Sequence, residues 1–560
     1  MQSKKLWMLL WCLGQLAIGQ QGMAPLQAPV DIPIGLSGTF GEIRASNIHA
    51  GVDIRTQGRQ GLPISSAWGG YVSRISVSTG GYGKAVYVTH PNGLMSVYAH
   101  LRRFSPKLEA YIKKWQYEKE SYTLQRFPKK GDLPITQGEL LGYSGNTGNS
   151  FGPHLHFELR DAATQEPVNP MRYGIKVADK QRPQLVRLMV FQKHANDSLG
   201  VVQLKRPTKV NDSLYTLPLF KTGGAIGFGL QLFDRQDRSW NKNGVYQIRL
   251  FVNGVEQYHY CSDRMSYTDS RHVSQLYDYP TYANQRIKIQ KLFPPLHQEF
   301  SFVSKTKTGF VTIEAGNAYQ VKIEVEDFEG NRSFLETYIT GTAATAHTPT
   351  PPKNQKLLCP DRDYLFDFEG STVYFPKGAF YRPHYISING SKDTLFIDRD
   401  RLPMKKALEI QIPVNTNDTL VQRQTFIAKH NAKGAPSYIG TRIKEGHWFA
   451  KTKGLGQFVI ARDSVAPEIL PANFKPQQWL SNYRYLKVKI KDDLSGIKRY
   501  RATINGQWAR FEYEPKTQTL TYDFRDQEFA LAPHELQLTV EDNCGNTAVY
   551  ETTIFRKYGK

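Results

Sequence analysis

The 560-residue chain is poor in cysteine, in acidic residues relative to basic ones, and in long apolar runs. Four cysteines in the whole chain exclude a disulfide-dense scaffold and a cysteine-rich zinc module, and the three beyond the leader permit at most one disulfide. Beyond residue 20 no stretch approaches the roughly 20 apolar residues that a membrane helix requires, so we expect no transmembrane segment there. Aromatic residues make up 12% of the chain, which excludes a mainly disordered protein.

The charge is strongly unbalanced, with 72 Lys and Arg against 50 Asp and Glu and a net charge of +22. A basic protein is drawn to anionic surfaces by long-range attraction. The chain carries no recognised nucleic-acid motif, so we expect anionic envelope polymers as partners and no nucleic acid. The alternative is that the charge serves solubility alone.

The N-terminus predicts a cleaved signal peptide over residues 1–19. Lys4 and Lys5 supply the positive region, residues 6–19 form a short apolar run, and Ala17-Ile-Gly19 offers a cleavage site. A membrane anchor or a buried helix is the alternative, but the run is too short to span a bilayer. We therefore expect a protein exported to the periplasm, the cell envelope or the exterior of the cell.

Short strand-like segments bounded by Gly, Pro and Asn follow one another along most of the chain, which predicts a mainly β protein. Residues 20–37 form a lead-in and residues 38–176 a glycine-rich β domain. One segment in that domain, about residues 105–120, has helical spacing of apolar residues, with Ser105 as N-cap and Pro106 at the first helical position. This basic helix is interpreted as a solvated face over a packing stripe, or as a lip of an active-site groove.

A weak internal repeat marks the remainder of the chain. A strand that ends in Asn-Gly and a strand that ends in Asp-x-x-Gly-Asn occur in the same order around residues 244–331 and again around 496–546. Evenly spaced strands with turn signals indicate Ig-like β-sandwiches, here expected over 182–342 and 464–560. A Pro/Thr/Ala-rich linker occupies 343–356, and 357–463 is a further β-rich domain to which we assign no activity.

Two short motifs carry candidate metal ligands. His49 and Asp53 are four residues apart, so a turn between them lets both reach one ion. In the segment His154-Leu-His156-Phe-Glu158, a strand places both histidines and the glutamate on one face, because side chains alternate along a strand. His49 and Asp53 together with His156 offer an N, O, N ligand set, and strand alternation alone does not decide between His154 and His156 as its third member. Glu158 is a candidate acceptor for a ligand imidazole, with an ordinary salt bridge as the alternative.

A zinc ion suits this ligand set. Catalytic zinc commonly takes three protein ligands and leaves its fourth position for water, whose pKa it lowers toward 7. His100 and His154 then remain to take and return a proton near neutral pH. Strand alternation places His100 on the face of Tyr98, opposite that of Ala99.

At these residues the sequence resembles the lysostaphin/LytM family of zinc metallopeptidases, which cleave peptide bonds in bacterial peptidoglycan. The similarity covers roughly residues 38–175 and rests on Phe40-Gly-Glu-Ile-Arg44, His49-x-Gly-Val-Asp53, Tyr98-Ala-His100-Leu101, Ser144-Gly-Asn-Thr-Gly148 and Gly152-Pro-His-Leu-His-Phe-Glu158. The resemblance implies an antiparallel β domain with a groove across the site. It also implies zinc held by His49, Asp53 and His156, with His100 and His154 acting on the water and the oxyanion.

The sequence departs from the family pattern in the helical insertion and in Phe151, which stands where the family has a small residue and is expected to narrow the approach to the metal. The leading hypothesis is an exported zinc metalloendopeptidase that hydrolyses stem peptides or cross-links of peptidoglycan. The alternatives are a non-catalytic envelope scaffold and an activator of another wall hydrolase. Metal ligands at every position argue against the activator.

Overall fold

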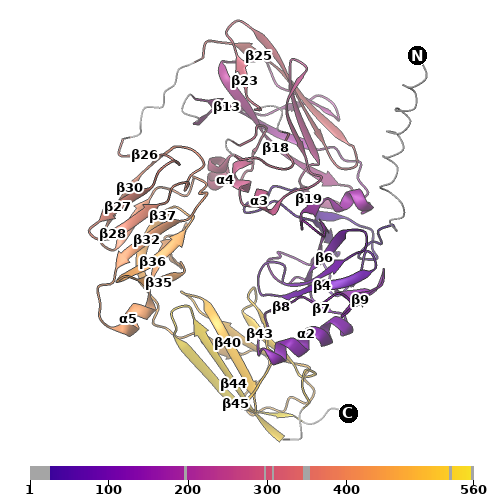
Figure 1. Cartoon of the computed structure of the whole chain (residues 1–560), viewed down its shortest axis with the longest axis vertical. Helices are drawn as coiled ribbons and strands as arrows, with labels where there is room; N and C mark the ends of the chain where they lie inside the picture. Colours follow the sequence, from indigo (N-terminus) through magenta and orange to yellow (C-terminus); the bar gives the residue numbers. More distant parts are fainter. Residues whose placement is uncertain are drawn as a thin grey trace, which may run out of the picture.

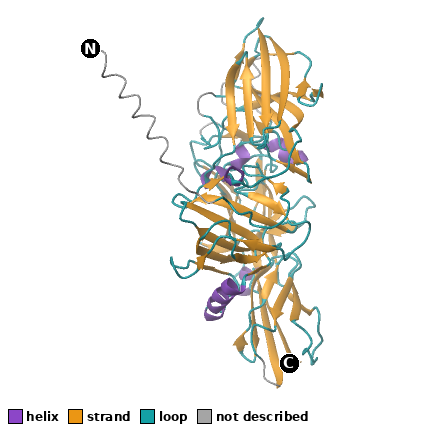
Figure 2. Cartoon of the chain, turned by 90° about the vertical axis from the view of Figure 1, so that its right-hand side faces the viewer, coloured by secondary structure: helices purple, strands orange, loops and turns teal. Residues whose placement is uncertain are grey.

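The computed structural model describes residues 25–194, 198–295, 298–304, 308–344, 353–528 and 532–556. The expected signal peptide and most of the expected linker lie outside these residues. Strands dominate the described chain and helices are short, which confirms the prediction of a mainly β protein (Figure 2). In the described part no helix is long and apolar enough to cross a membrane. Cys261, Cys359 and Cys544 are free thiols.

The N-terminal module, residues 36–173, is built on two antiparallel sheets. The larger sheet has the order β1 (Leu36–Gly38), β2 (Val52–Arg55), β11 (His154–Asp161), β6 (Leu94–Leu101), β5 (Lys84–Thr89), β4 (Gly70–Val77) and β8 (Leu124–Arg126), with β12 (Pro167–Val168) on β11 and β9 (Pro134–Ile135) on β4. The smaller sheet has the order β3 (Pro63–Ser65), β10 (Leu140–Tyr143) and β7 (Arg103–Phe104), and a 3-10 turn spans Pro170–Tyr173. Both faces of the larger sheet are covered, so His156 and Glu158 are as buried as Leu155 and Phe157.

The expected helical insertion is helix α2 (Pro106–Glu118). Leu108, Ile112 and Gln116 form its buried stripe, while Trp115 is only partly buried and carries the Arg126 guanidinium on its ring. Ser105 occupies the N-cap position with extended backbone, but its side chain makes no capping hydrogen bond. The predicted N-cap position of Ser105 is therefore confirmed, but the hydroxyl does not satisfy a backbone N–H of the first turn.

The first β module, residues 184–341, continues the hydrophobic core of the N-terminal module. One sheet has the order β14 (Leu199–Lys205), β13 (Gln184–Lys193), β18 (Gly224–Gln236) and β19 (Ser239–Asn243), with β22 (Gln290–Lys291) and β23 (Val311–Ile313) on β18. The other has the order β15 (Thr208–Lys209), β16 (Leu214–Thr216), β25 (Arg332–Gly341), β24 (Ala318–Glu326), β20 (Gln247–Val252) and β21 (Val255–Cys261), with β17 (Phe220–Thr222) on β25. Between β21 and β22 lie α3 (Tyr267–Ser270), a 3-10 turn (Val273–Gln275) and α4 (Tyr279–Gln285).

The middle β module, residues 356–462, has a separate core. One of its larger sheets has the order β27 (Tyr364–Phe368), β28 (Ser371–Phe375), β32 (Leu408–Pro413), β36 (His447–Thr452) and β35 (Thr441–Lys444). The other has the order β30 (Ile388–Ser391), β31 (Thr394–Ile397), β37 (Gly456–Arg462), β33 (Thr425–His430) and β34 (Pro436–Tyr438). A small pair is formed by β26 (Lys356–Leu358) and β29 (His384–Ile386), and α5 spans Thr419–Gln424.

The C-terminal β module, residues 468–556, repeats part of the first one. One sheet has the order β38 (Glu468–Pro471), β39 (Tyr485–Lys491), β43 (Thr519–Asp523) and β42 (Glu512–Glu514). The other has the order β41 (Gln507–Trp508), β40 (Ile497–Ile504), β44 (Ala532–Asp542) and β45 (Thr547–Arg556). The run β41-β40-β44-β45 matches β21-β20-β24-β25, and Asn253 and Asn505 both adopt positive φ in the corresponding hairpins. The repeat seen in the sequence therefore has a counterpart in strand order.

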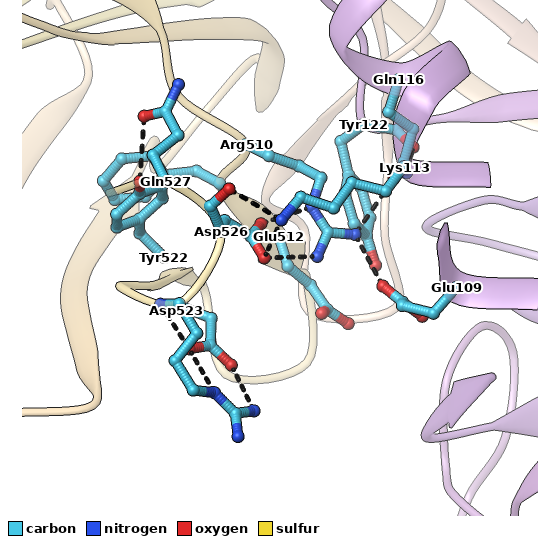
Figure 3. Close-up of polar contacts among 12 residues, drawn as sticks. Glu109, Lys113, Gln116, Tyr122, Arg510, Glu512, Tyr522, Asp523, Asp526 and Gln527 are labelled. Atoms are coloured by element: carbon cyan, nitrogen blue, oxygen red, sulfur yellow. Dashed lines mark hydrogen bonds and ion pairs between the residues drawn. The ribbon is translucent and has the colours of Figure 1, made fainter. Parts of the chain in front are cut away.

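The four modules are arranged in a ring, in which the C-terminal module contacts helix α2 of the N-terminal module (Figure 1). Arg510 donates hydrogen bonds to Glu109 and Gln116 of the helix, each at 3.0 Å, and it also pairs with Asp526 at 2.6 Å (Figure 3). Lys113 of the helix contacts the same Asp526 at 3.2 Å. The polar face of α2 is thus a contact surface between modules, and this accounts for its charge better than a free groove lip does.

Candidate metal centre and active site

Three side chains from the start of the N-terminal module converge on one point. Asp53 on β2 lies directly opposite His156 on β11 in the antiparallel register, and His49 precedes β2. His49 Nε2 lies 3.1 Å from Asp53 Oδ1 and 3.1 Å from His156 Nδ1, while His156 Nδ1 lies 2.8 Å from Asp53 Oδ1. All three residues are buried. The strand pairing therefore brings together residues that are about a hundred positions apart in the sequence.

The hydrogen bonds on the far sides of the two rings define which atoms face this point. His49 Nδ1 lies 2.8 Å from the carbonyl oxygen of Thr39, so Nδ1 donates and Nε2 keeps its lone pair. His156 Nε2 lies 2.7 Å from Glu158 Oε1, so Nε2 donates and Nδ1 keeps its lone pair. When both rings are neutral, two imidazole lone pairs and a carboxylate oxygen thus face one another with no donor among them. Such a set fits a zinc ion, because ligands about 2.0–2.2 Å from a tetrahedral zinc are roughly 3.4 Å apart.

The electrostatics of the cluster also favour a cation. Burial raises the pKa of Asp53, but the neighbouring His49 charge and hydrogen bonds with the histidines outweigh it and hold the pKa well below its ordinary value. Burial lowers the pKa of His156, but hydrogen bonds to Asp53 and Glu158 raise it to about 9. Two carboxylates on either side of one imidazole therefore attract positive charge to this position.

The His100 ring lies at the same site, although strand alternation predicts that it points to the opposite face of the sheet. Its backbone has φ of 58°, and the pairing of β5 with β6 shifts register between Lys84 and Val86. The His100 ring lies 4.8 Å from that of His154 and 5.8 Å from that of His156, between ring centroids. The prediction that His100 shares the face of Tyr98 is therefore wrong. An irregular, left-handed residue at the strand end turns the ring toward the ligands.

His100 and His154 present similar acceptor atoms. His100 Nδ1 donates to the carbonyl oxygen of Thr147 at 2.8 Å, and His154 Nδ1 donates to that of Gly152 at 2.8 Å. Because Nδ1 donates in both rings, Nε2 is the nitrogen of each ring that can accept a proton. Burial and the neighbouring histidines lower the pKa of His100 to about 3, so this ring is neutral at pH 7. His154 Nε2 lies 3.4 Å from Asp53 Oδ1, at the edge of the ligand cluster.

Several supporting residues escaped the sequence reasoning. Arg44 Nη2 contacts Asp53 Oδ2 at 2.5 Å and fixes the carboxylate oxygen that does not face the histidines. The Tyr82 hydroxyl donates to Glu158, and the Tyr82 ring stacks on His156. Tyr267 on α3 of the first β module donates to Glu158 Oε2 at 3.2 Å. Arg44 lies in the matched Phe-Gly-Glu-Ile-Arg segment, which was its only signal, whereas no local pattern points to Tyr267.

Glu158 connects the site to the sheet behind it. Burial raises the pKa of Glu158, but the Arg160 guanidinium and the His156 ring lower it overall, so the carboxylate is ionised. Both alternatives considered for Glu158 are present together, since it accepts from His156 and pairs with Arg160 at 2.6 Å. Phe151, by contrast, is fully exposed on the loop that leads into His154. This arrangement is suited to metal-assisted hydrolysis with two imidazoles beside the ion.

In a comparison with known proteins, two segments of the chain match models of protein families. Residues 47–117 and 116–170 match the model of Peptidase family M23, and residues 355–463 match that of the Zu5-like domain. The prophage-encoded M23 protein EnpA from Enterococcus faecalis, whose catalytic domain has a solved structure, is 26% identical over 27% of this chain and 97% of that domain, with a TM-score of 0.20.

Curated relatives match over the same N-terminal segment. The protein named DD-carboxypeptidase/endopeptidase Mpg, from Neisseria meningitidis serogroup B, is 32% identical over 128 residues, which is 23% of this chain and 23% of that protein. The peptidoglycan DD-endopeptidase ShyA from Vibrio cholerae is 31% identical over 120 residues, 21% of each chain. The match thus spans less than a quarter of these two relatives. The chain carries a Peptidase family M23 domain, within which its histidine cluster lies.

Proposed function

We propose that the protein is an exported zinc metalloendopeptidase that hydrolyses peptide bonds in the stem peptides or cross-links of bacterial peptidoglycan. The observation that carries the proposal is the convergence of His49 Nε2, Asp53 Oδ1 and His156 Nδ1 within 3.1 Å of one another, in a domain of a peptidase family. The names of the curated relatives support peptidoglycan as substrate and the bacterial envelope or periplasm as location.

In this proposal His49, Asp53 and His156 hold the zinc. When bound, zinc polarises the scissile carbonyl and makes a water molecule acidic enough to attack near pH 7. Arg44 holds Asp53 in place through its outer oxygen, and Glu158 fixes the orientation of His156 through the Nε2 hydrogen bond. These two are positioning residues, since neither faces the substrate side of the cluster.

The remaining two histidines handle the proton. His100 Nε2 accepts a proton from the attacking water, because its ring is neutral and its Nδ1 is committed to Thr147. The same atom returns the proton to the leaving amine. His154 lies next to the Asp53 carboxylate, and a proton that its Nε2 takes from solvent before the reaction would be donated in a hydrogen bond to the oxygen on which negative charge develops.

We also propose the domain division expected from the sequence, with a signal peptide at 1–19, the peptidase domain at 38–176, Ig-like β-sandwiches at 182–342 and 464–560, and the β-rich domain at 357–463. The three sheet-bearing segments beyond the peptidase domain support this division. Anionic envelope polymers are proposed as further partners, on the net charge of +22.

The test is digestion of purified sacculi by the full-length chain, with metal content measured in the same preparations. We expect His156→Ala to lose bound zinc and all release of muropeptide fragments. His430→Ala is the matched control, because His430 lies on β33 in the middle β module and contacts Gln457. A folded, zinc-loaded wild type that releases no fragment, or an H156A variant as active as wild type, contradicts the proposal.

A further inference from the structure

A second cluster of ionisable side chains lies at the junction of the N-terminal module and the first β module. Asp179 lies in the connector, Asp234 lies near the end of β18 and Asp327 follows β24. Oxygen atoms of the three carboxylates all lie within 4.8 Å of one another. Asp234 and Asp327 are buried, and Asp327 is the aspartate of the repeated Asp-x-x-Gly-Asn motif. Nothing in the proposed peptidase mechanism uses these residues.

One buried member of this cluster, Asp234, lacks a partner that a buried polar group needs, whereas Asp327 accepts hydrogen bonds from Asn331. Asp234 is only 2% exposed, and its Oδ1 has no hydrogen-bond partner among the described residues. Asn243, opposite Asp234 in the β18–β19 pairing and also 2% exposed, has neither its amide nitrogen nor its amide oxygen bonded within the same part of the chain. Leaving such atoms without a partner is costly, so a group that accepts oxygen ligands is expected here.

The space between these side chains has the size and charge of a cation site. A cavity of about 30 Å³ is lined by Asp179, Asp234, Asp327 and Glu329 and, among the residues described, by no lysine, arginine or histidine. One water-sized sphere needs about 10–15 Å³, so the cavity accommodates one ion with little to spare. Burial and then repulsion from Asp327 and Asp179 raise the pKa of Asp234 to about 9. In a chain with a net charge of +22, this acidic cavity has no counter-charge of its own.

The second copy of the repeat provides an internal comparison. Asp463, Asp492 and Asp542 form the same kind of cluster in the C-terminal module. There the carboxylates accept backbone N–H groups: Asp492 from Gly496, Asp542 from Asn546, and Asp463 from Ser495. Those hydrogen bonds satisfy the second cluster from within the chain. The unpartnered Asp234 is what distinguishes the first cluster.

We propose that Asp179, Asp234 and Asp327 bind a hard divalent cation of the calcium type. The donor set consists of oxygen atoms alone, which suits calcium and disfavours zinc or copper. Three carboxylates supply up to six oxygen atoms, and calcium takes six to eight. This site is separate from the histidine cluster, whose two imidazoles suit zinc.

The position of the site gives the ion a structural role. Thr39 also lines the cavity, and its hydroxyl donates to the carbonyl oxygen of Gly244 in the first β module. The Thr39 carbonyl oxygen is the acceptor that orients His49. The cation therefore binds the connector and the first β module together immediately behind a residue of the peptidase site, and it is expected to raise the thermal stability of that junction.

Calcium binding to the full-length, zinc-loaded chain tests the inference by calorimetry and thermal unfolding. We expect one calcium ion per chain with Kd on the order of 10⁻⁴ M, as in extracellular calcium modules, and a Tm that rises by several degrees at millimolar calcium. Asp234→Asn is expected to weaken binding at least tenfold and to abolish the rise in Tm. His156→Ala is expected to keep both, which separates this site from the proposed zinc site.

Asp492→Asn is the matched control, because it alters the corresponding aspartate of the satisfied cluster. It is expected to leave the calcium affinity and the calcium-dependent rise in Tm unchanged. The inference is overturned if wild type binds no calcium, if D234N retains wild-type affinity, or if D492N and not D234N abolishes binding. If Asp234 is protonated and no cation binds, wild type shows no calcium binding. In that case D234N is at least as stable as wild type at every calcium concentration.

Discussion

Arg510 in the C-terminal β module donates a hydrogen bond of 3.0 Å to Glu109 on helix α2, across 401 positions of sequence. The same guanidinium pairs with Asp526, and both side chains of that pair are largely buried. One arginine thus connects the end of the chain to the helix inserted in the peptidase domain (Figure 3).

Replacing Arg510 is expected to open this contact. Arg510→Ala leaves Asp526 and Glu109 without their main cationic partner, and breaking a buried pair typically costs about 3 kcal/mol. We expect urea denaturation to show that loss, and small-angle scattering to show a larger maximum dimension. Arg499→Ala is the control, since Arg499 pairs with Glu541 on an exposed surface and such pairs contribute about 0–1 kcal/mol. Equal losses in the two variants would contradict the role given to Arg510.

Glu158 is expected to set the zinc affinity. Glu158→Gln keeps the shape of the side chain but removes the charge behind His156, and changes of this kind weaken metal binding by about 10–100-fold. Competition with a zinc chelator measures the effect, and the far-ultraviolet circular dichroism spectrum should stay unchanged. Glu256→Gln on β21 is the control and should bind zinc like wild type. An affinity for E158Q within twofold of wild type would rule out this positioning role.

Phe151 is expected to contact the substrate. It is fully exposed on the loop before His154, so its truncation removes no packing. Loss of one aromatic contact of about 1 kcal/mol raises KM about fivefold in Phe151→Ala, with kcat and Tm unchanged. Trp240→Ala removes another exposed aromatic side chain, on β19, and should change neither constant. A KM for F151A equal to that of wild type would place the substrate elsewhere.

Lys291 is expected to give the first β module a distinctive pH dependence. Burial and the Arg382 charge lower the pKa of Lys291 to about 7, against an ordinary value near 10.5, and Asp278 compensates only in part. Between pH 7 and 10.5 the unfolded chain therefore binds a proton at this lysine that the folded chain does not. The contribution of Lys291 to the free energy of unfolding therefore rises with pH between 7 and 10.5, by at most about 1.4 kcal/mol per pH unit. It falls again as the pH is lowered to 7.

Urea denaturation from pH 7 to 9.5 checks the sign. Lys291→Met should be more stable than wild type at pH 7, and the difference should shrink as pH rises. Parallel stability curves for K291M and wild type would show that Lys291 keeps its ordinary pKa in the folded state.

Local spacing explains why part of the site could be predicted. His49 and Asp53 lie in one short motif, and alternation on a single strand relates His156 to Glu158. The orientation of His100 could not be predicted in this way, because it depends on a left-handed residue at an irregular strand end. The contacts of Tyr267 with Glu158 and of Arg510 with Glu109 join residues 109 and 401 positions apart, and no local pattern encodes them.

In the repeated modules, too, features encoded by short motifs could be predicted, whereas contacts between distant residues could not. The Asp-x-x-Gly-Asn motifs and the Asn-Gly turns are visible in the sequence, and the strand orders of the two modules match accordingly. The junction cavity was not predicted, because it forms only when Asp179, Asp234 and Asp327 meet across a connector and two strands.

The ring arrangement of the four modules has a consequence for the order in which the protein folds. Domains fold as units, beginning with the part of the chain that is synthesised first. Glu109 on helix α2 meets Arg510 only once the chain has been completed as far as Arg510, 401 positions later. The peptidase domain therefore acquires its final surroundings last, and a chain cut short before the C-terminal module leaves the polar face of that helix open to water.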